Sequence, residues 1–249
     1  TDDDGVSDGD EISDGTDPSI AVSPYVNRSL RVEDEDYLEL KAEERFDLTA
    51  SWTLETWVKI SADENDGGAL ISRRLEFGDG REDQVNFELG INDSMQLYVR
   101  YVDADGFEQR AAAHQELLKN QWLHLAGVYN HEVGSLTLYV NGREEWTASV
   151  GPFRNDIDRD GQVVQRVGEG FDGWLDEVAI TRRVAQISPR SSERGSQYTV
   201  LYYKFDDGGD FIADNSPLIT QNWLNDWRHS PEKVDPSANG TIEVVSGGA

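Results

Sequence analysis

The sequence predicts an all-β protein made of two packed antiparallel sheets. Short segments with alternating apolar and polar residues recur from residue 37 onward, as expected for half-buried strands. Turn pairs such as Asn141–Gly142 and Asn92–Asp93 separate several of these segments. Only Gln115–Lys119 has a helical pattern, and strands do not alternate with helices as a parallel sheet requires. These observations favour an antiparallel sandwich around one core.

The first half of the chain supplies strands with clear inward and outward faces. Because side chains alternate along a strand, Trp57 is expected on the face opposite to that of Trp52 and its alternate neighbours. Turns are expected at 92–93 and at 103–106. The strands are predicted at residues 37–40, 52–60, 69–72, 85–91, 95–102 and 107–112.

The second half begins with two strands, 122–129 and 136–140, that are expected to pair as antiparallel neighbours. Asn141–Gly142 is the strongest hairpin signal in the chain. For the segment 200–205, one interpretation pairs it with the N-terminal strand to finish the sandwich, and another begins a truncated second copy; we favour the first. The remaining strands are predicted at 143–147, 163–168 and 174–181.

Three of these segments resemble a known family. They are Trp122–Asn130 (WLHLAGVYN), Ser135–Gly142 (SLTLYVNG) and Phe171–Thr181 (FDGWLDEVAIT). Together they resemble laminin-G-like, concanavalin A-like domains, over roughly residues 25 to 205. The resemblance implies a jelly-roll sandwich with a binding or adhesion role. It also implies that His124 is a core or sheet-face residue, and that four tryptophans lie in the core: Trp52, Trp57, Trp122 and Trp174.

The composition limits the partners. Lysine and arginine number 22 against 49 aspartates and glutamates, a formal net charge of −27. Such a surface repels nucleic acid and anionic lipid, and attracts cations. The chain has no cysteine, so disulfide and thiol chemistry are excluded. No apolar run approaches the roughly 18 residues of a membrane span, which argues against membrane insertion.

The N-terminal segment 1–18, TDDDGVSDGDEISDGTDP, has the spacing of a calcium loop. Alternate oxygens, a glycine at the sharp bend and a closing glutamate are what such a loop needs. The string resembles a thrombospondin type 3 repeat, and this resemblance implies a calcium-binding linker at residues 1–19, followed by one domain at 20–249. The alternative interpretation of this segment is a disordered acidic tail. Because the first ligand position would precede Thr1, we expect the chain to be a segment of a longer protein. The expected ligands are Asp2, Asp4, the Val6 carbonyl, Asp8 and Glu11.

Two further acidic groups are candidates for metal binding. The family resemblance implies a structural calcium at Asp176, with Asp34 or Asp36 as a partner. The alternative is that Asp176 caps a turn or accepts backbone hydrogen bonds. The loop 155–161 holds half of a second calcium pattern, and its alternative is a solvated acidic loop. Its candidate ligands are Asp156, Asp158 and Asp160.

The sequence shows no catalytic constellation. Paired carboxylates with the E-x-D-x-E spacing of sandwich glycosidases do not occur, nor do nucleophile elbows or zinc spacings. Tryptophans outside the family-like strands are candidates for stacking on sugar rings. They are Trp146, Trp223 and Trp227.

The resulting hypothesis is a non-catalytic, calcium-binding carbohydrate- or ligand-binding or adhesion module of a larger secreted or cell-surface bacterial protein. Its partners would be calcium, a glycan or another surface protein, and neighbouring domains of the parent chain. The alternatives are a structural spacer in a surface array, filament or stalk, and the accessory domain of a glycoside hydrolase.

Overall fold

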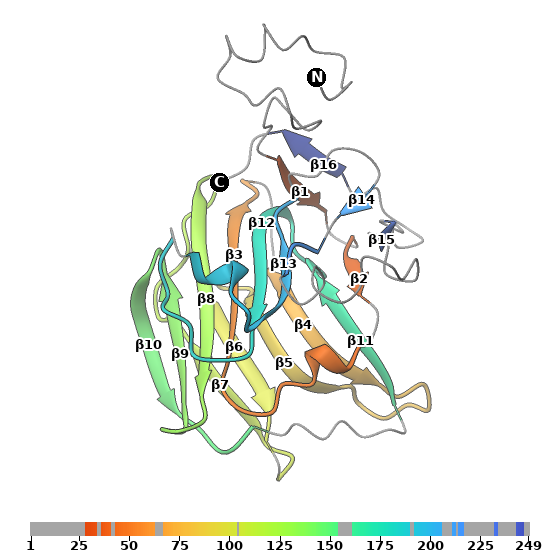
Figure 1. The fold of residues 1–249 in the computed structure, drawn as a ribbon, viewed down its shortest axis with the longest axis vertical. Coiled ribbons are helices and arrows are strands. Elements are labelled where there is room, and N and C mark those ends of the chain that lie inside the picture. The colour runs from red at the N-terminus through yellow and green to blue at the C-terminus, as the bar shows by residue number, and fades with distance from the viewer. Residues whose placement is uncertain are drawn as a thin grey trace, which may run out of the picture.

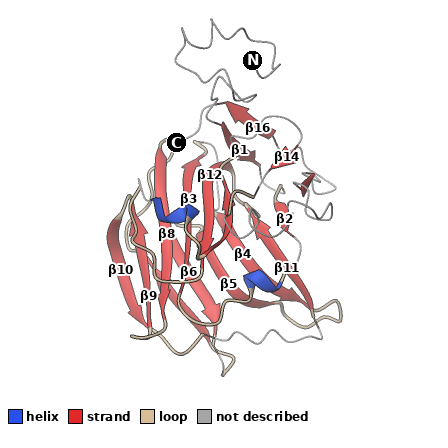
Figure 2. Cartoon of the chain, viewed as in Figure 1, coloured by secondary structure: helices blue, strands red, loops and turns tan. Residues whose placement is uncertain are grey.

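The architecture is that of a two-sheet sandwich, seen in a computed structural model (Figure 1). The structure describes residues 28–33, 36–40, 43–62, 67–103, 105–153, 161–189, 192–205, 211–212, 214–216, 232–233 and 243–246. Strands dominate these residues, with two short 3-10 helices, η1 (Glu44–Phe46) and η2 (Ser192–Gly195) (Figure 2). The strands are β1 (Arg28–Val32), β2 (Leu38–Leu40), β3 (Trp52–Ile60), β4 (Gly68–Glu76), β5 (Gln84–Ile91), β6 (Leu97–Val102), β7 (Glu108–Ala112), β8 (Trp122–Asn130), β9 (Ser135–Val140), β10 (Arg143–Ser149), β11 (Gln162–Val167), β12 (Gly173–Thr181), β13 (Thr199–Tyr203), β14 (Phe211–Ile212), β15 (Glu232–Lys233) and β16 (Glu243–Ser246).

Two sheets contain most of the strands. The eight-stranded sheet has the order β10-β9-β8-β3-β12-β1-β16, and β13 pairs with the second half of β12. The six-stranded sheet has the order β2-β11-β4-β5-β6-β7, while β14 and β15 form a separate two-stranded sheet. Every strand pair among the described residues is antiparallel. The predicted all-β class of two antiparallel sheets is therefore confirmed.

The core lies between the sheets and follows from strand alternation. Along β3, Leu54 and Val58 are fully buried, while Trp57 and Lys59 point to the other side and are partly exposed. Trp52 is also fully buried, and its ring packs against aromatic side chains from both sheets. The predicted division of this strand into two faces is confirmed.

The predicted helix at Gln115–Lys119 is wrong, because these residues form an irregular connection before β8. The Leu117 amide donates to the Met95 carbonyl oxygen at 2.7 Å, and the Leu117 side chain is buried against the core. A five-residue segment gains too few helical hydrogen bonds to offset nucleation, so these tertiary contacts decide its conformation.

The strand predicted at 200–205 is present as β13, but its expected partner is wrong. It pairs with β12, placing Val178 opposite Tyr203, whereas β1 pairs with β12 on one side and β16 on the other. β1 and β13 thus occupy successive stretches of the same edge of β12. Pairing partners depend on distant segments, which local sequence patterns do not specify.

The predicted hairpin at Asn141–Gly142 is confirmed. Both residues have positive φ angles, 52° and 78°, as a type I′ turn requires. Asn141 also accepts a hydrogen bond from the His124 amide at 2.9 Å and donates its own amide to the His124 carbonyl at 2.7 Å. The turn is thereby attached to the neighbouring strand β8.

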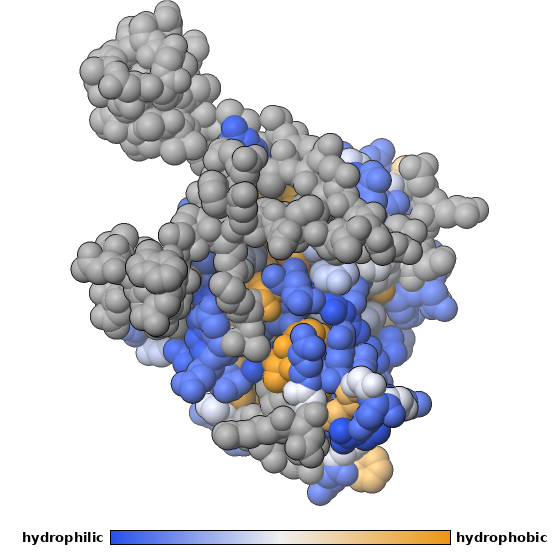
Figure 3. Space-filling model, turned by 90° about the vertical axis from the view of Figure 1, so that its right-hand side faces the viewer, coloured by the Kyte–Doolittle hydropathy of each residue, from blue (hydrophilic) through white to orange (hydrophobic). Residues whose placement is uncertain are grey.

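The side of the molecule on which β2 and β11 lie is mainly hydrophilic where it is described (Figure 3). In Figure 3, hydrophobic residues appear as small patches among hydrophilic ones on the side where β2 and β11 lie. No helix within the described residues combines the length and the apolar character needed to cross a membrane.

Candidate functional site

The outer face of the eight-stranded sheet carries two rows of cross-strand neighbours with different exposure. The first row is largely buried and contains short or paired side chains. The second row is partly exposed and contains tryptophans and cations. In register across the strands, the first row is Tyr139–Ala126–Glu55–Ala179–Tyr202 and the second is Trp122–Lys59–Trp174–Arg31.

The segment between β12 and β13, which is described at residues 182–189 and 192–198, crosses the first row and is called the strap (Figure 1). Thr53 on β3 holds it: the hydroxyl donates to the Arg183 carbonyl at 2.8 Å and accepts the Ala185 amide at 3.1 Å. Ala126 and Ala179 on the sheet are fully buried. Because their side chains are short, the strap backbone can approach the sheet closely.

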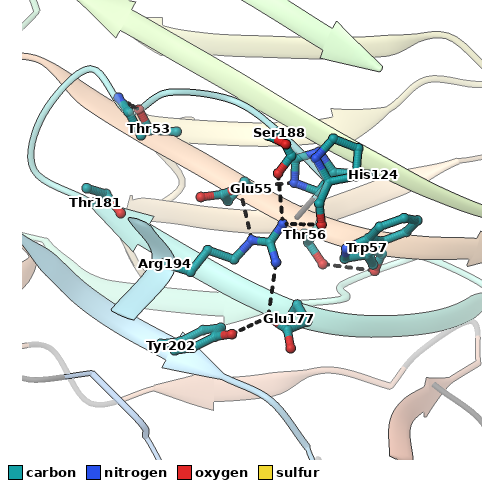
Figure 4. Close-up of polar contacts among 12 residues, drawn as sticks. Thr53, Glu55, Thr56, Trp57, His124, Glu177, Thr181, Ser188, Arg194 and Tyr202 are labelled. Atoms are coloured by element: carbon teal, nitrogen blue, oxygen red, sulfur yellow. Dashed lines mark hydrogen bonds and ion pairs between the residues drawn. The ribbon is translucent and has the colours of Figure 1, made fainter. Parts of the chain in front are cut away.

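Arg194, in η2 of the strap, binds the strap to carboxylates of the sheet (Figure 4). Its Nε lies 3.1 Å from Glu55 Oε2 and its Nη1 lies 3.1 Å from Glu177 Oε2. Nη2 donates to the carbonyl oxygens of Ser188 and Pro189 at 3.3 and 3.1 Å. The guanidinium therefore contacts β3, β12 and the part of the strap that precedes η2.

One oxygen of the Glu55 carboxylate, Oε2, is shared by two partners inside this cluster. His124 Nε2 lies 3.0 Å from Glu55 Oε2, and both side chains are almost completely buried. Burial by itself would lower the pKa of Arg194, but Glu55 and Glu177 raise it above its ordinary value, so the guanidinium stays charged. A carboxylate enclosed in this way cannot contact a ligand, and the cluster's role is to hold the strap.

Glu177 reaches the cluster through a β-bulge. The register of β12 against β3 shifts between Asp176 and Ala179, and Glu177 has a φ of 51°, uncommon for a residue with a side chain. The Tyr202 hydroxyl donates to the Glu177 carboxylate. Burial raises the pKa of Tyr202, and this carboxylate raises it further. Sequence reasoning missed the bulge, because the DEV segment reads as continuous strand.

The second row, together with Trp57, forms a surface that we call the tryptophan face: Arg31, Trp57, Lys59, Trp122 and Trp174. All five side chains are partly exposed. The Arg31 guanidinium carbon lies 4.3 Å from the Trp174 ring centroid and the Lys59 ammonium 4.8 Å from it. Cations stacked on an indole ring at this range are attracted to its π system.

The expectation that four family-strand tryptophans lie in the core is correct only for Trp52. Trp57, Trp122 and Trp174 lie on the outer face of the sheet and are partly exposed. The family resemblance implied burial, but alternation places Trp57, Trp122 and Trp174 on the side of the strand opposite to that of its core residues. The signal available in the sequence was Lys59, which shares the parity of Trp57.

The outer face of the six-stranded sheet has a different character. A row of cross-strand neighbours there runs Glu39–Arg166–Ser72–Glu88–Arg100–Arg110. Arg166 pairs with Glu39 at 3.1 Å, and Arg100 pairs with Glu88 at 2.8 Å. These charges largely neutralise one another, so this face offers fewer open groups to a ligand than the tryptophan face.

Asp176 is buried, with 2% of its surface exposed, and its Oδ1 accepts the Glu177 amide at 2.8 Å. The backbone hydrogen bond that we considered as the alternative role is thus present. Calcium prefers six to eight oxygen ligands, but the described residues contain no group of three acidic or histidine side chains that could hold a metal. These residues do not by themselves form a calcium site, and the metal role of Asp176 stays a prediction.

Trp146 lies on the edge strand β10, 41% exposed, with its ring centroid 4.5 Å from that of His114. It is placed opposite the buried Leu138 of β9 and therefore lies at the rim of the sandwich, away from the tryptophan face. The other candidate residues lie outside the described part of the chain: Asp2, Asp4, Val6, Asp8, Glu11, Asp34, Asp156, Asp158, Asp160, Trp223 and Trp227.

Comparison with protein families gives one match. Residues 33–186, more than half of the chain, match a family model described as the concanavalin A-like lectin/glucanases superfamily. A search of curated proteins found no match.

Solved structures with a similar fold include glycan-binding domains. A putative carbohydrate-binding protein of Bacteroides ovatus aligns with a TM-score of 0.57 and 18% identity, over 89% of this chain and 60% of that one. The CBM40 of Ruminococcus gnavus IT-sialidase, bound to α2,3-sialyllactose, aligns with a TM-score of 0.53 and 18% identity, over 63% of this chain and 91% of that one. A NanB sialidase of Streptococcus pneumoniae aligns with a TM-score of 0.50 and 19% identity, over 66% of this chain and 26% of that one. At these identities the likeness concerns the fold.

Proposed function

Because the chain belongs to the concanavalin A-like lectin/glucanase superfamily, we propose that it is a non-catalytic carbohydrate-binding module of a larger secreted or cell-surface protein. The tryptophan face is the proposed binding surface. The observation that carries this proposal is the alignment of three partly exposed tryptophans on one sheet face.

Physical chemistry and the structural neighbours support the proposal. Aromatic rings bury large apolar areas while the indole N–H remains a polar contact, which suits the mixed apolar and polar faces of a sugar. The rigid sheet holds these rings in place, so little conformational entropy is lost when a ligand binds. The Bacteroides ovatus protein is described as carbohydrate-binding, and the Ruminococcus gnavus CBM40 was solved with a bound sialyllactose.

Replacing Trp57 or Trp122 with alanine is expected to weaken glycan binding about tenfold or more. Aromatic residues in a binding surface commonly contribute ~2 kcal/mol, and 1.4 kcal/mol corresponds to a factor of about ten. The measurement is a glycan array with the intact chain, followed by isothermal titration of the best ligand with each variant.

Trp146→Ala is the matched control, because Trp146 is partly exposed but lies at the rim on β10. It should bind like the parent chain. If Trp146→Ala alone loses binding, the site lies at the rim and the tryptophan face is the wrong surface; if no glycan binds, the proposed function is wrong.

We also propose calcium binding by the N-terminal aspartate loop, whose ligands would be Asp2, Asp4, Val6, Asp8 and Glu11. The support is the oxygen spacing in the sequence, together with the preference of calcium for carboxylate and carbonyl oxygens. The acidic loop 155–161 and Asp176 are the other candidate sites.

Calcium is expected to bind to the intact chain, with Glu11→Gln losing one site from the stoichiometry measured by isothermal titration. Where a site forms only in the folded domain, calcium at about 100 times its dissociation constant adds ~2.7 kcal/mol and raises Tm by roughly 5–11 °C. Chelator should reverse the shift. If calcium produces neither binding heat nor a change in Tm, these aspartates do not bind calcium and only contribute negative surface charge.

A further inference from the structure

The open polar groups of the tryptophan face are all hydrogen-bond donors. They are the Lys59 ammonium and the indole N–H groups of Trp57, Trp122 and Trp174, which have no hydrogen-bond acceptor among the described residues. An ammonium carries three donors and an indole carries one, and neither can accept. A ligand that satisfies this surface must therefore supply acceptor oxygens.

The nearby acidic side chains do not meet this need. Asp172 accepts from Arg31 at 2.8 Å and Glu33 accepts from the same guanidinium at 2.9 Å. Asp176 is buried beside Trp57 in the register and accepts the Glu177 amide. Each of these carboxylates thus already accepts a hydrogen bond, whereas the Lys59 ammonium and the three indole N–H groups have no acceptor among the described residues.

Among the described residues, Lys59 also lacks an ionic partner, although acidic residues outnumber basic ones by 49 to 22 in the full chain. Across the described residues, no carboxylate lies within 4.0 Å of its ammonium, whereas Arg31 in the same row pairs with two. The neighbours of Lys59 are tryptophans: Trp174 on β12 and Trp122 on β8 lie directly across from it. Charge and donors are thus concentrated between two aromatic rings.

We propose that the tryptophan face binds a carboxylate-bearing saccharide, with the carboxylate on Lys59 and the sugar ring against the neighbouring indoles. This rests on the proposed function and specifies its ligand class. Hydrogen bonds between an ammonium and a carboxylate are stronger than those between neutral groups. They therefore raise the affinity for an acidic sugar above that for a neutral sugar. The net charge of −27 opposes an anionic ligand only weakly, because salt at 0.15 M screens exposed charges beyond about 8 Å.

The test is isothermal titration of the intact chain with two matched ligand pairs. Oligogalacturonate is compared with its methyl-esterified form, and 3′-sialyllactose with its methyl ester, so that hexuronates and sialosides are distinguished. The acidic member of at least one pair is expected to bind about tenfold more tightly, the effect of one charged hydrogen bond. Lys59→Met should abolish that preference and change the affinity of the neutral member less than about twofold, and Lys59→Arg should retain part of it.

Arg110→Met is the control, because Arg110 is exposed on the opposite sheet and stacks on Tyr98, 4.5 Å from its ring centroid, without an ion pair in the described structure. It should keep the preference. Equal binding of the acidic and neutral members, or an unchanged preference in Lys59→Met, overturns the ligand class while leaving a carbohydrate-binding module intact. If no saccharide binds the parent chain, the proposed function fails as well.

Discussion

Replacing Arg194 with methionine is expected to lower the free energy of unfolding by about 3–5 kcal/mol. The substitution removes the shared partner of Glu55 and Glu177, and Glu55 is 1% exposed. Breaking a buried ion pair by deleting one member leaves a charge in a medium that solvates it poorly, which costs far more than losing a surface pair. The strap would also lose the two hydrogen bonds to its carbonyl groups. Denaturant unfolding followed by tryptophan fluorescence measures the loss.

Two variants separate this effect from a general sensitivity to arginine loss. Arg143→Met removes an exposed arginine of β10 that has no ion pair among the described residues, and should change stability by less than about 0.5 kcal/mol. Arg194→Lys keeps the charge but not the planar fork that contacts four partners, so its loss should be intermediate. A loss below about 1 kcal/mol for Arg194→Met would show that the cluster does not hold the strap.

Replacing Trp52 with alanine is expected to cost a similar ~3–5 kcal/mol, the range for removing a large aromatic side chain from a core. Trp52 is fully buried, and its ring centroid lies 5.7 Å from that of Tyr129 and 6.0 Å from that of Phe87. Because these partners belong to different sheets, the cavity would open in the contact between them. Thermal and denaturant unfolding should both report the loss.

Trp52→Phe should lose clearly less than Trp52→Ala. The Trp52 indole N–H is buried without an acceptor in the described part of the chain, so removing it relieves a desolvation penalty that partly offsets the smaller ring. Trp146→Ala removes the same side chain from the 41% exposed rim position and should cost less than either core variant. Equal losses at Trp52 and Trp146 would contradict the placement of Trp52 at the centre of the core.

The strands that sequence reasoning located best are those whose pattern is local. β3 has the predicted bounds Trp52–Ile60, and the Asn141–Gly142 hairpin joins β9 to β10 as expected. Side-chain alternation and turn chemistry act over a few residues, so they can be read directly from the sequence. Strand partners were harder, since β13 pairs with β12 and β1 with β16.

The candidate site could be predicted only in part. The sequence indicated that Trp57 lies on the face opposite to Trp52, and the family-like strands indicated a binding domain. It did not indicate that Arg194 reaches Glu55, a contact between residues 139 positions apart. Nor did it indicate the bulge that turns Glu177 toward Arg194, because no glycine marks that left-handed position.

By itself, the sequence determined an antiparallel sandwich with one apolar face on each sheet, because alternation sorts the residues of each strand into two sets. Only the tertiary structure decided what covers the outer set. The strap buries Glu55 and Ala126, whereas the row at Lys59 stays partly exposed. Coverage depends on segments that approach from distant parts of the chain, so burial of an outward residue is a property of the whole fold rather than of its strand.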